Sequence, residues 1–190
     1  MKRAIIVHGC PSNIERAMDP KKRTYNKHWM PWLKKQLEKH KIKTIIPLMP
    51  TPWKPSYSSW KKRFEKLPVN DNTILIGHSC GGGFLIRWLD ETKRKIKRLI
   101  LVSPGKVGKA RTKFRSDLYG NKIIKNLNKH VKDKIIIIFT SNDDIPTHIK
   151  AAYEYKNELP AKVIFLKNRG HYTLGDMGTE EFPEILKFIR

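Results

Sequence analysis

Residues 74–83 read ILIGHSCGGG: an apolar run ends at a glycine and leads into a histidine, a serine, a cysteine and three more glycines. Two interpretations fit such a run. It is either a serine nucleophile on a sharp turn or a glycine-rich loop that holds a phosphate. A phosphate-binding loop needs a lysine directly after its last glycine, and Phe84 follows Gly83 instead. A dinucleotide-binding fingerprint is expected after the first strand, where the chain reads HGCP at 8–11. Both phosphate-binding interpretations are therefore disfavoured.

The five residues Gly77-His78-Ser79-Cys80-Gly81 match the nucleophile-elbow pattern G-x-S-x-G at every position. In an elbow the serine sits on a tight strand-to-helix turn, with a strained backbone and its Oγ exposed above the sheet edge. Gly77 and Gly81 would leave room for neighbouring chain at so tight a turn. The alternative role for Ser79 is a helix N-cap in a glycine-rich turn. The apolar run before it and the amphipathic stretch after it favour the nucleophile.

Outside this stretch, short apolar runs alternate with longer amphipathic segments. Strands are predicted at 4–7, 44–46, 73–76, 99–102, 135–139 and 163–166, and helices at 28–40, 57–67, 81–93, 122–130, 147–158 and 180–189. The apolar runs are rich in Ile and Val and barely alternate, which is typical of parallel strands buried on both faces. We therefore predict one α/β domain over 1–190, a three-layer sandwich of about six mostly parallel strands with helices on both faces. The expected strand order is roughly 2-1-3-4-5-6.

The chain is strongly basic, with 40 Lys and Arg against 17 Asp and Glu and a formal net charge of +23. The excess runs through both halves of the sequence and consists mostly of Lys, which indicates a solvated surface more than a specific nucleic-acid site. Two cysteines form no disulfide framework and have no metal-binding spacing. The apolar run near the N-terminus is too short for a signal-peptide core or a membrane span. We expect a soluble, cytoplasmic protein with no membrane span, and a monomer because of its charge.

An elbow predicts that an acid and then a histidine follow the serine in the chain. The fifth predicted strand leads into S141-N142-D143-D144, and the sixth leads into a Gly170-His171 pair. His171 would take the serine proton, and either Asp143 or Asp144 would orient its imidazole. No other histidine follows the last strand. Four others fall on predicted helical stretches and are interpreted as surface residues: His28, His40, His130 and His148.

The oxyanion hole of such an enzyme needs two backbone N–H groups, one of them from the residue after the nucleophile. That residue is Cys80. The second donor is expected from the loop after the first strand, where Pro11 has no N–H and Cys10 is therefore chosen. Each thiol itself is interpreted as a small, inert side chain.

Taken together, these motifs resemble the small serine hydrolases of the α/β-hydrolase superfamily that are related to retinoblastoma-binding protein 9 and to YdeN. The resemblance covers most of the chain. It rests on HG at 8–9, HWMPWL at 28–33, the prolines of PLMPTP at 47–52 with Trp60 after them, GHSCGG at 77–82, SNDD at 141–144 and GH at 170–171.

The resemblance implies a compact hydrolase that cleaves carboxylic esters or similar acyl bonds. Relatives often read S-x-N-D-P with the catalytic aspartate three residues after the serine, which implies Asp144. Ile145 replaces the proline here, so Asp143 stays as the alternative. The aspartate that is not used would cap the helix beginning near Thr147.

The sequence thus predicts a Ser79-His171-Asp144 triad that needs no metal or organic cofactor and acts on a small-molecule acyl substrate. Residues 103–120 form a long connection that could serve as a short lid or substrate loop. Its basic stretch 104–116 would suit an anionic substrate, or would simply be a solvated loop. Two alternatives stay open. One is transfer of the acyl group to an acceptor other than water. The other is a decayed hydrolase fold whose basic surface binds a protein or nucleic acid.

Overall fold

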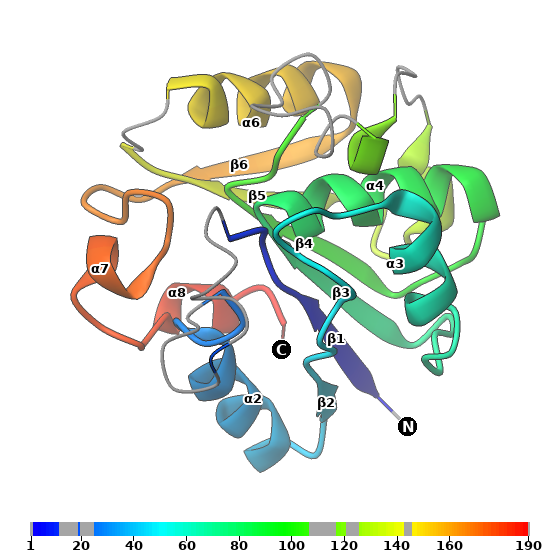
Figure 1. Ribbon diagram of the computed structural model, residues 1–190, viewed down its shortest axis with the longest axis horizontal. Helices are drawn as coiled ribbons and strands as arrows, with labels where there is room; N and C mark the ends of the chain where they lie inside the picture. Colours follow the sequence, from blue (N-terminus) through cyan, green and yellow to red (C-terminus); the bar gives the residue numbers. More distant parts are fainter. Residues whose placement is uncertain are drawn as a thin grey trace.

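A computed structural model describes residues 2–11, 19, 25–106, 117–120, 126–142 and 146–189. Its centre is a six-stranded sheet in the order β2-β1-β3-β4-β5-β6, with every neighbouring pair parallel. The strands are β1 (Arg3–Val7), β2 (Lys43–Ile45), β3 (Thr73–His78), β4 (Arg98–Val102), β5 (Ile136–Thr140) and β6 (Ala161–Phe165). The predicted α/β fold and strand order are confirmed (Figure 1).

The central strands are buried because helices cover both faces of the sheet. All six residues of β3 are buried, as the run of Ile and Leu predicts. The edge strands differ: β6 has no buried position, and Phe165 at its end is 44% exposed. The expectation of burial on both faces therefore holds for the middle of the sheet and fails at β6, which has a neighbour on one side only.

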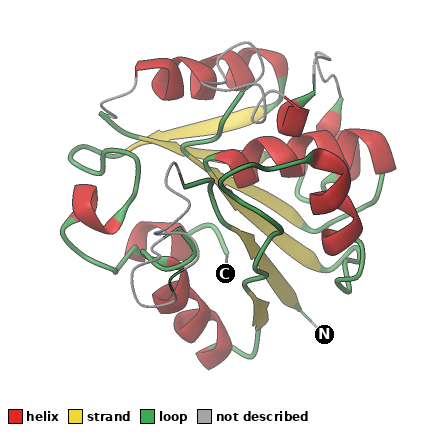
Figure 2. Cartoon of the chain, in the orientation of Figure 1, coloured by secondary structure: helices red, strands yellow, loops and turns green. Residues whose placement is uncertain are grey.

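The helices divide into two layers, visible as red ribbons on either side of the yellow sheet in Figure 2. One layer contains α3 (Tyr57–Phe64), α4 (Cys80–Thr92) and α6 (Pro146–Glu158), whose apolar residues share a core with Ile5, Leu75 and Leu101. The other contains α2 (Met30–Lys39) and α8 (Pro183–Leu186), which pack with Ile6, Ile76 and Val102. Alternate residues of one strand thus supply the two cores, as the period of a strand requires.

Three segments differ from the predicted helices. Residues 122–125 of the helix predicted at 122–130 lie outside the described residues, and 127–130 form the 3₁₀ helix η1 (Leu127–His130). The helix predicted at 180–189 is shorter, since α8 begins at Pro183, a residue favoured in a first turn. A short helix that was not predicted, α7 (Leu174–Met177), follows His171 and has a capping box between Thr173 and Asp176.

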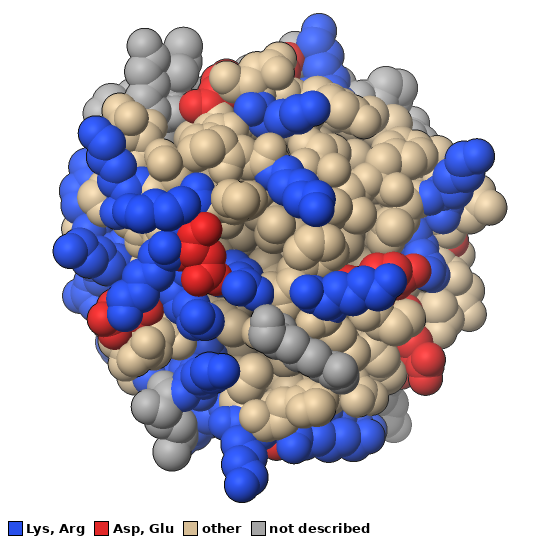
Figure 3. All heavy atoms as spheres, turned by 180° about the vertical axis from the view of Figure 1, so that it is seen from behind, with Lys and Arg blue, Asp and Glu red and all other residues tan. Residues whose placement is uncertain are grey.

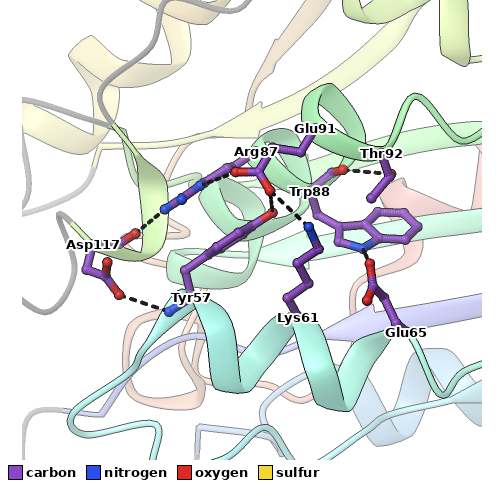
Figure 4. A network of polar contacts seen from close by, with 8 residues as sticks. All are labelled: Tyr57, Lys61, Glu65, Arg87, Trp88, Glu91, Thr92 and Asp117. Carbon is purple, nitrogen blue, oxygen red and sulfur yellow. Dashed lines mark hydrogen bonds and ion pairs between the residues drawn. The ribbon is translucent and has the colours of Figure 1, made fainter.

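A polar network joins α3 to α4, the helix that follows the elbow (Figure 4). The Tyr57 hydroxyl donates to Glu91 Oε2 at 2.7 Å, and Arg87 Nε donates to Glu91 Oε1 at 2.8 Å. The Arg87 guanidinium also lies over the Tyr57 ring, 3.5 Å from its centroid, and donates to the Asp117 carbonyl. Tyr57 N–H donates to Asp117 Oδ2 at 3.0 Å. These contacts attach the segment at 117–120 to the same two helices.

The basic surface contains acidic partners. Figure 3 shows Lys and Arg spread over one face of the molecule, with Asp and Glu among them. Ion pairs include Lys132 with Asp71 at 2.7 Å and Arg98 with Asp133 at 2.5 Å. Among the described residues, no helix is long and apolar enough to cross a membrane.

Candidate active site

Ser79 lies between the end of β3 and the first residue of α4, with φ 51° and ψ −120°. This is a strained conformation for a residue with a side chain, of the kind that a nucleophile elbow requires. Hydrogen bonds hold the strained backbone on both sides. Ser79 N–H donates to the Val102 carbonyl at 2.9 Å, and the Ser79 carbonyl accepts from Gly105 N–H at 2.9 Å.

Two glycines make the turn possible. A Cβ on Gly77 would lie 2.6 Å from Gly82 Cα, and a Cβ on Gly81 would lie 2.4 Å from the Val7 carbonyl oxygen. Both distances are too short for any side chain, and the obstructing atoms belong to the backbone. The glycines therefore provide clearance, which lets α4 begin directly against the end of β1.

His171 lies in the loop after β6, and its Nε2 is 2.9 Å from Ser79 Oγ. Both backbone groups of His171 are engaged. Its carbonyl accepts from His78 Nε2 at 2.8 Å, and its N–H donates to Asp176 Oδ2 at 3.0 Å. Gly170 has φ 46°, and a Cβ there would lie 2.7 Å from Asp176 Cβ. The imidazole is thus positioned by the elbow residue His78 on one side and by the start of α7 on the other.

The second ring nitrogen of His171, Nδ1, lies beside a serine that we did not predict from the sequence. Ser103 Oγ lies 3.1 Å from His171 Nδ1. Ser103 is fully buried, directly follows β4 and has φ 44°. No motif marks this residue. Only its position in the chain could have indicated a role: Ser103 follows the end of β4, and the elbow follows the end of the neighbouring strand β3, at the same edge of the sheet.

Asp144 and its alternative Asp143 lie outside the described residues. The residues just before them are attached to the loop that carries His171. Asn142 Oδ1 accepts from Asn168 N–H at 2.6 Å, and Ser141 Oγ accepts from Arg169 N–H at 2.9 Å. The segment that leads into the two aspartates therefore runs beside the histidine loop.

The two cysteines predicted as oxyanion donors lie near Ser79. Cys80 is the first residue of α4, and its buried Sγ accepts a hydrogen bond from the Tyr119 hydroxyl at 3.1 Å. Gly9, next to Cys10, approaches the elbow so closely that a Cβ would lie 3.1 Å from Ser79 Cβ. His8 orients this loop: its Nε2 accepts from Met49 N–H at 3.0 Å, and its Nδ1 lies 2.7 Å from the Gly9 carbonyl.

A cleft of about 510 Å³ opens over these groups. It is lined by Ser79, His171 and His78, by residues 9–11, by Tyr25 and His28, and by residues 173–175. No Lys, Arg, Asp or Glu is among these described lining residues. Lys106, the first lysine of the basic stretch that would suit an anionic substrate or a solvated loop, forms ion pairs with Glu158 at 2.5 Å and Glu154 at 3.5 Å on α6. The rest of the basic stretch, 107–116, lies outside the described residues.

Two histidines interpreted as surface residues lie close to His171 or to the cleft, and the interpretation was wrong for His28, which is buried. His28 precedes α2 instead of lying on it, is 7% exposed and lines the cleft. His148 lies on α6, and its ring stacks on His171 with centroids 4.2 Å apart and an interplanar angle of 26°.

Burial keeps two of the clustered imidazoles neutral. Desolvation lowers the pKa of His28 to about 4, and the nearby Asp176 carboxylate offsets only part of that effect. Desolvation also lowers the pKa of His78 well below its usual value, and the charge of His171 acts in the same direction. Among the described residues, no group of three or more His, Cys, Asp or Glu side chains could hold a metal ion.

Comparison with solved structures shows the same fold. The product of the ydeN gene of B. subtilis is 21% identical, with a TM-score of 0.80 over 100% of this chain and 97% of that chain. Carboxylesterase CesB (YbfK) from Bacillus subtilis is 15% identical, with a TM-score of 0.56 over 99% of this chain and 81% of that chain. Naproxen esterase from Bacillus subtilis is 12% identical, with a TM-score of 0.57 over 100% and 84%. At these identities the likeness concerns the fold alone.

At the sequence level, no curated protein matches the chain. A family model described as serine hydrolase matches residues 22–190, which is most of the sequence. The match includes the elbow and the loop of His171. The chain therefore belongs to the serine hydrolase family, with the fold of the α/β hydrolases.

Proposed function

We propose that this protein hydrolyses small carboxylic esters through an acyl-serine intermediate, with Ser79 as the nucleophile and His171 as the general base. The observation that carries the proposal is the 2.9 Å contact between Ser79 Oγ and His171 Nε2, made by a serine with a strained elbow backbone. A structural serine at a helix start needs neither this backbone nor a histidine partner from a distant loop.

The ring nitrogens of His171 suit this role. With its hydrogen on Nδ1, which lies 3.1 Å from Ser103 Oγ, the neutral ring would present the Nε2 lone pair to the Ser79 hydroxyl. In acylation, Ser79 Oγ forms a bond to the ester carbon while Nε2 takes the hydroxyl proton. The carbonyl π electrons move to oxygen, giving a tetrahedral oxyanion. As that intermediate collapses, the carbon–oxygen bond to the alcohol breaks and Nε2–H protonates the departing alcohol.

Deacylation repeats these steps with water as the nucleophile. His171 takes a proton from the water, the hydroxyl adds to the acyl carbon, and the second intermediate releases the carboxylic acid as Ser79 regains its proton. In both intermediates the backbone N–H groups of Cys80 and Cys10 would hold the oxyanion. The start of α4 behind Cys80 adds the positive end of a helix dipole.

Asp144 is proposed as the acid that stabilises the His171 imidazolium, with Asp143 as the alternative. The proposal is supported by the two hydrogen bonds that join residues 141–142 to residues 168–169 beside the histidine loop. A neutral serine at Nδ1 can orient the ring but cannot neutralise the charge that develops on it. Ser103 is therefore assigned a positioning role beside the carboxylate.

The test is hydrolysis of short-chain 4-nitrophenyl esters by the full chain and by Ser79→Ala. We expect turnover by the wild type, a burst of nitrophenol when acylation outpaces deacylation, and a loss of at least about a thousandfold in kcat in the variant. An undiminished rate in Ser79→Ala would contradict the proposal. Ester product formed with an added alcohol, in preference to the acid, would instead identify an acyltransferase.

A further inference from the structure

His28 is a buried imidazole in the wall of the cleft whose role the proposed mechanism leaves open. It is 7% exposed, has φ 48° and lies two residues before α2 begins at Met30. Its ring centroid is 6.1 Å from that of His78, and the His78 ring centroid is 5.2 Å from that of His171. The His78 ring therefore lies between His28 and His171, the histidine that contacts Ser79.

The hydrogen-bonding state of His28 is fixed by the backbone. Leu174 N–H donates to His28 Nδ1 at 2.9 Å, so Nδ1 must present its lone pair. A neutral imidazole has one hydrogen, which is then on Nε2. Nε2 has no hydrogen-bond partner among the described residues, although the side chain is more than nine-tenths buried and lines the cleft.

Burial lowers the pKa of His28 to about 4, so the ring stays neutral at physiological pH. The described lining of the cleft is also uncharged, and beside the histidines and Ser79 it includes Pro11, Tyr25, Thr173 and Leu174. A neutral N–H donor in such a wall suits a neutral acceptor oxygen. A substrate carboxylate would lose its hydration there without meeting a positive charge among the described lining residues.

We propose that His28 is a substrate-binding residue whose Nε2–H donates to an ether, hydroxyl or carbonyl oxygen of an uncharged ester. The inference rests on the proposed esterase function and narrows it. The preferred substrates carry a second oxygen beyond the ester group, and the cleft selects them over hydrocarbon esters of the same shape. This replaces the anionic substrate that the basic stretch 104–116 would have suited.

The test uses pairs of esters in which one CH₂ is replaced by an ether oxygen. Methoxyacetate and butanoate esters differ in this way on the acyl side, and 2-methoxyethyl and butyl acetates differ in this way on the alcohol side. The ratio of kcat/KM within each pair is measured for the wild type and for variants. Because each variant is compared with the wild type, the intrinsic reactivity of the esters cancels.

Two substitutions separate the two nitrogens of His28. His28→Asn keeps an acceptor at the position of Nδ1 for Leu174 N–H, suits the positive φ and removes the donor from the cleft. His28→Gln gives up the Nδ1 acceptor and returns an amide N–H near the position of Nε2. We expect His28→Asn to lower the ether preference in one of the pairs by roughly fivefold, and His28→Gln to restore part of it.

An unchanged ratio in His28→Asn, or an equal loss for all four esters, would overturn the proposal, since it would leave His28 only a structural role at residues 173–175.

A second measurement needs no turnover and no change at His28. Ser79→Ala is labelled with ¹⁵N-histidine and titrated with each ester, and the His28 Nε2–H resonance should shift downfield only with the ether member. Absence of that shift would also overturn it. If Ser79→Ala shows the shift but the wild type hydrolyses none of the four esters, the esterase function is refuted and the binding role of His28 is not.

Discussion

Ser103 and His171 meet at the sheet edge, with Ser103 Oγ 3.1 Å from His171 Nδ1, although 68 positions separate them in the chain. The contact arises because β3, β4 and β5 are neighbours and the loop after β6 folds back over their carboxyl ends. A buried hydroxyl at this nitrogen gives the imidazole a second fixed point, in addition to its contact with Ser79.

Removing that hydroxyl should lower kcat and leave KM nearly unchanged. We expect Ser103→Ala to lose about threefold to tenfold in kcat, which is the effect of one neutral hydrogen bond. Ser103→Gly is the matched control, because glycine relieves the positive φ of 44° while it also lacks the hydroxyl. If the two variants lose the same factor in kcat although their melting temperatures differ, the positioning role is supported. If the loss in kcat instead varies with the loss in melting temperature, that role is refuted.

The choice between the two aspartates is tested by a pair of isosteric variants. Asp144→Asn should lower kcat by about a thousandfold or more, because the imidazolium loses its counter-charge, and Asp143→Asn should stay within about threefold of the wild type. Ester hydrolysis is the readout, with circular dichroism to verify folding. The reverse pattern would assign Asp143 as the acid.

Gly81→Ala tests whether the elbow glycines provide clearance. The new Cβ would lie 2.4 Å from the Val7 carbonyl oxygen and 2.6 Å from that of His8, and both atoms belong to the backbone of the sheet. We expect a loss of about 3 kcal/mol or more in the free energy of unfolding. Gly175→Ala is the control, since its Cβ would meet nothing closer than 3.8 Å. Urea denaturation of both variants checks the prediction, and equal midpoints would contradict it.

The buried histidines predict a loss of stability in acid. In the folded protein the pKa of His28 is lowered from 6.5 to about 4, chiefly by desolvation, with Asp176 opposing and His171 reinforcing the shift. Below pH 6.5 the unfolded chain binds a proton at this residue that the folded chain does not bind. The free energy of unfolding should therefore fall as pH drops from 6.5 to 4, by up to about 3 kcal/mol from His28.

His78 acts in the same direction because its pKa is also lowered by burial. The measurement is urea denaturation across this pH range for the wild type and for His28→Asn, which retains His78. The variant should lose less stability on acidification. Identical pH dependence in the two proteins would contradict the neutral, buried state of His28.

Much of the fold followed from the sequence, because its signals are local. Ile- and Val-rich runs that do not alternate gave the parallel strands, and the pattern from Gly77 to Gly81 gave the turn at the centre of the sheet. The chain order of an elbow then singled out His171. These inferences needed only the rule that carboxyl ends of parallel strands share an edge.

The parts of the site that the sequence missed depend on tertiary contacts. His28 fitted a helical pattern, but the helix begins after it, and a positive φ turns the residue toward the cleft. His148 does lie on a helix, and only the packing of α6 brings its ring over His171. Ser103 belongs to no motif, and its role appears only once β4 lies beside β3.

The central claim is that Ser79 is an activated nucleophile. The most direct measurement is treatment of the folded protein with a fluorophosphonate, followed by mass spectrometry of the intact chain and its peptides. We predict one adduct, located on Ser79, which is absent from Ser79→Ala and from wild type denatured before treatment. A folded wild type that forms no adduct, or an adduct that persists in Ser79→Ala, would contradict the account.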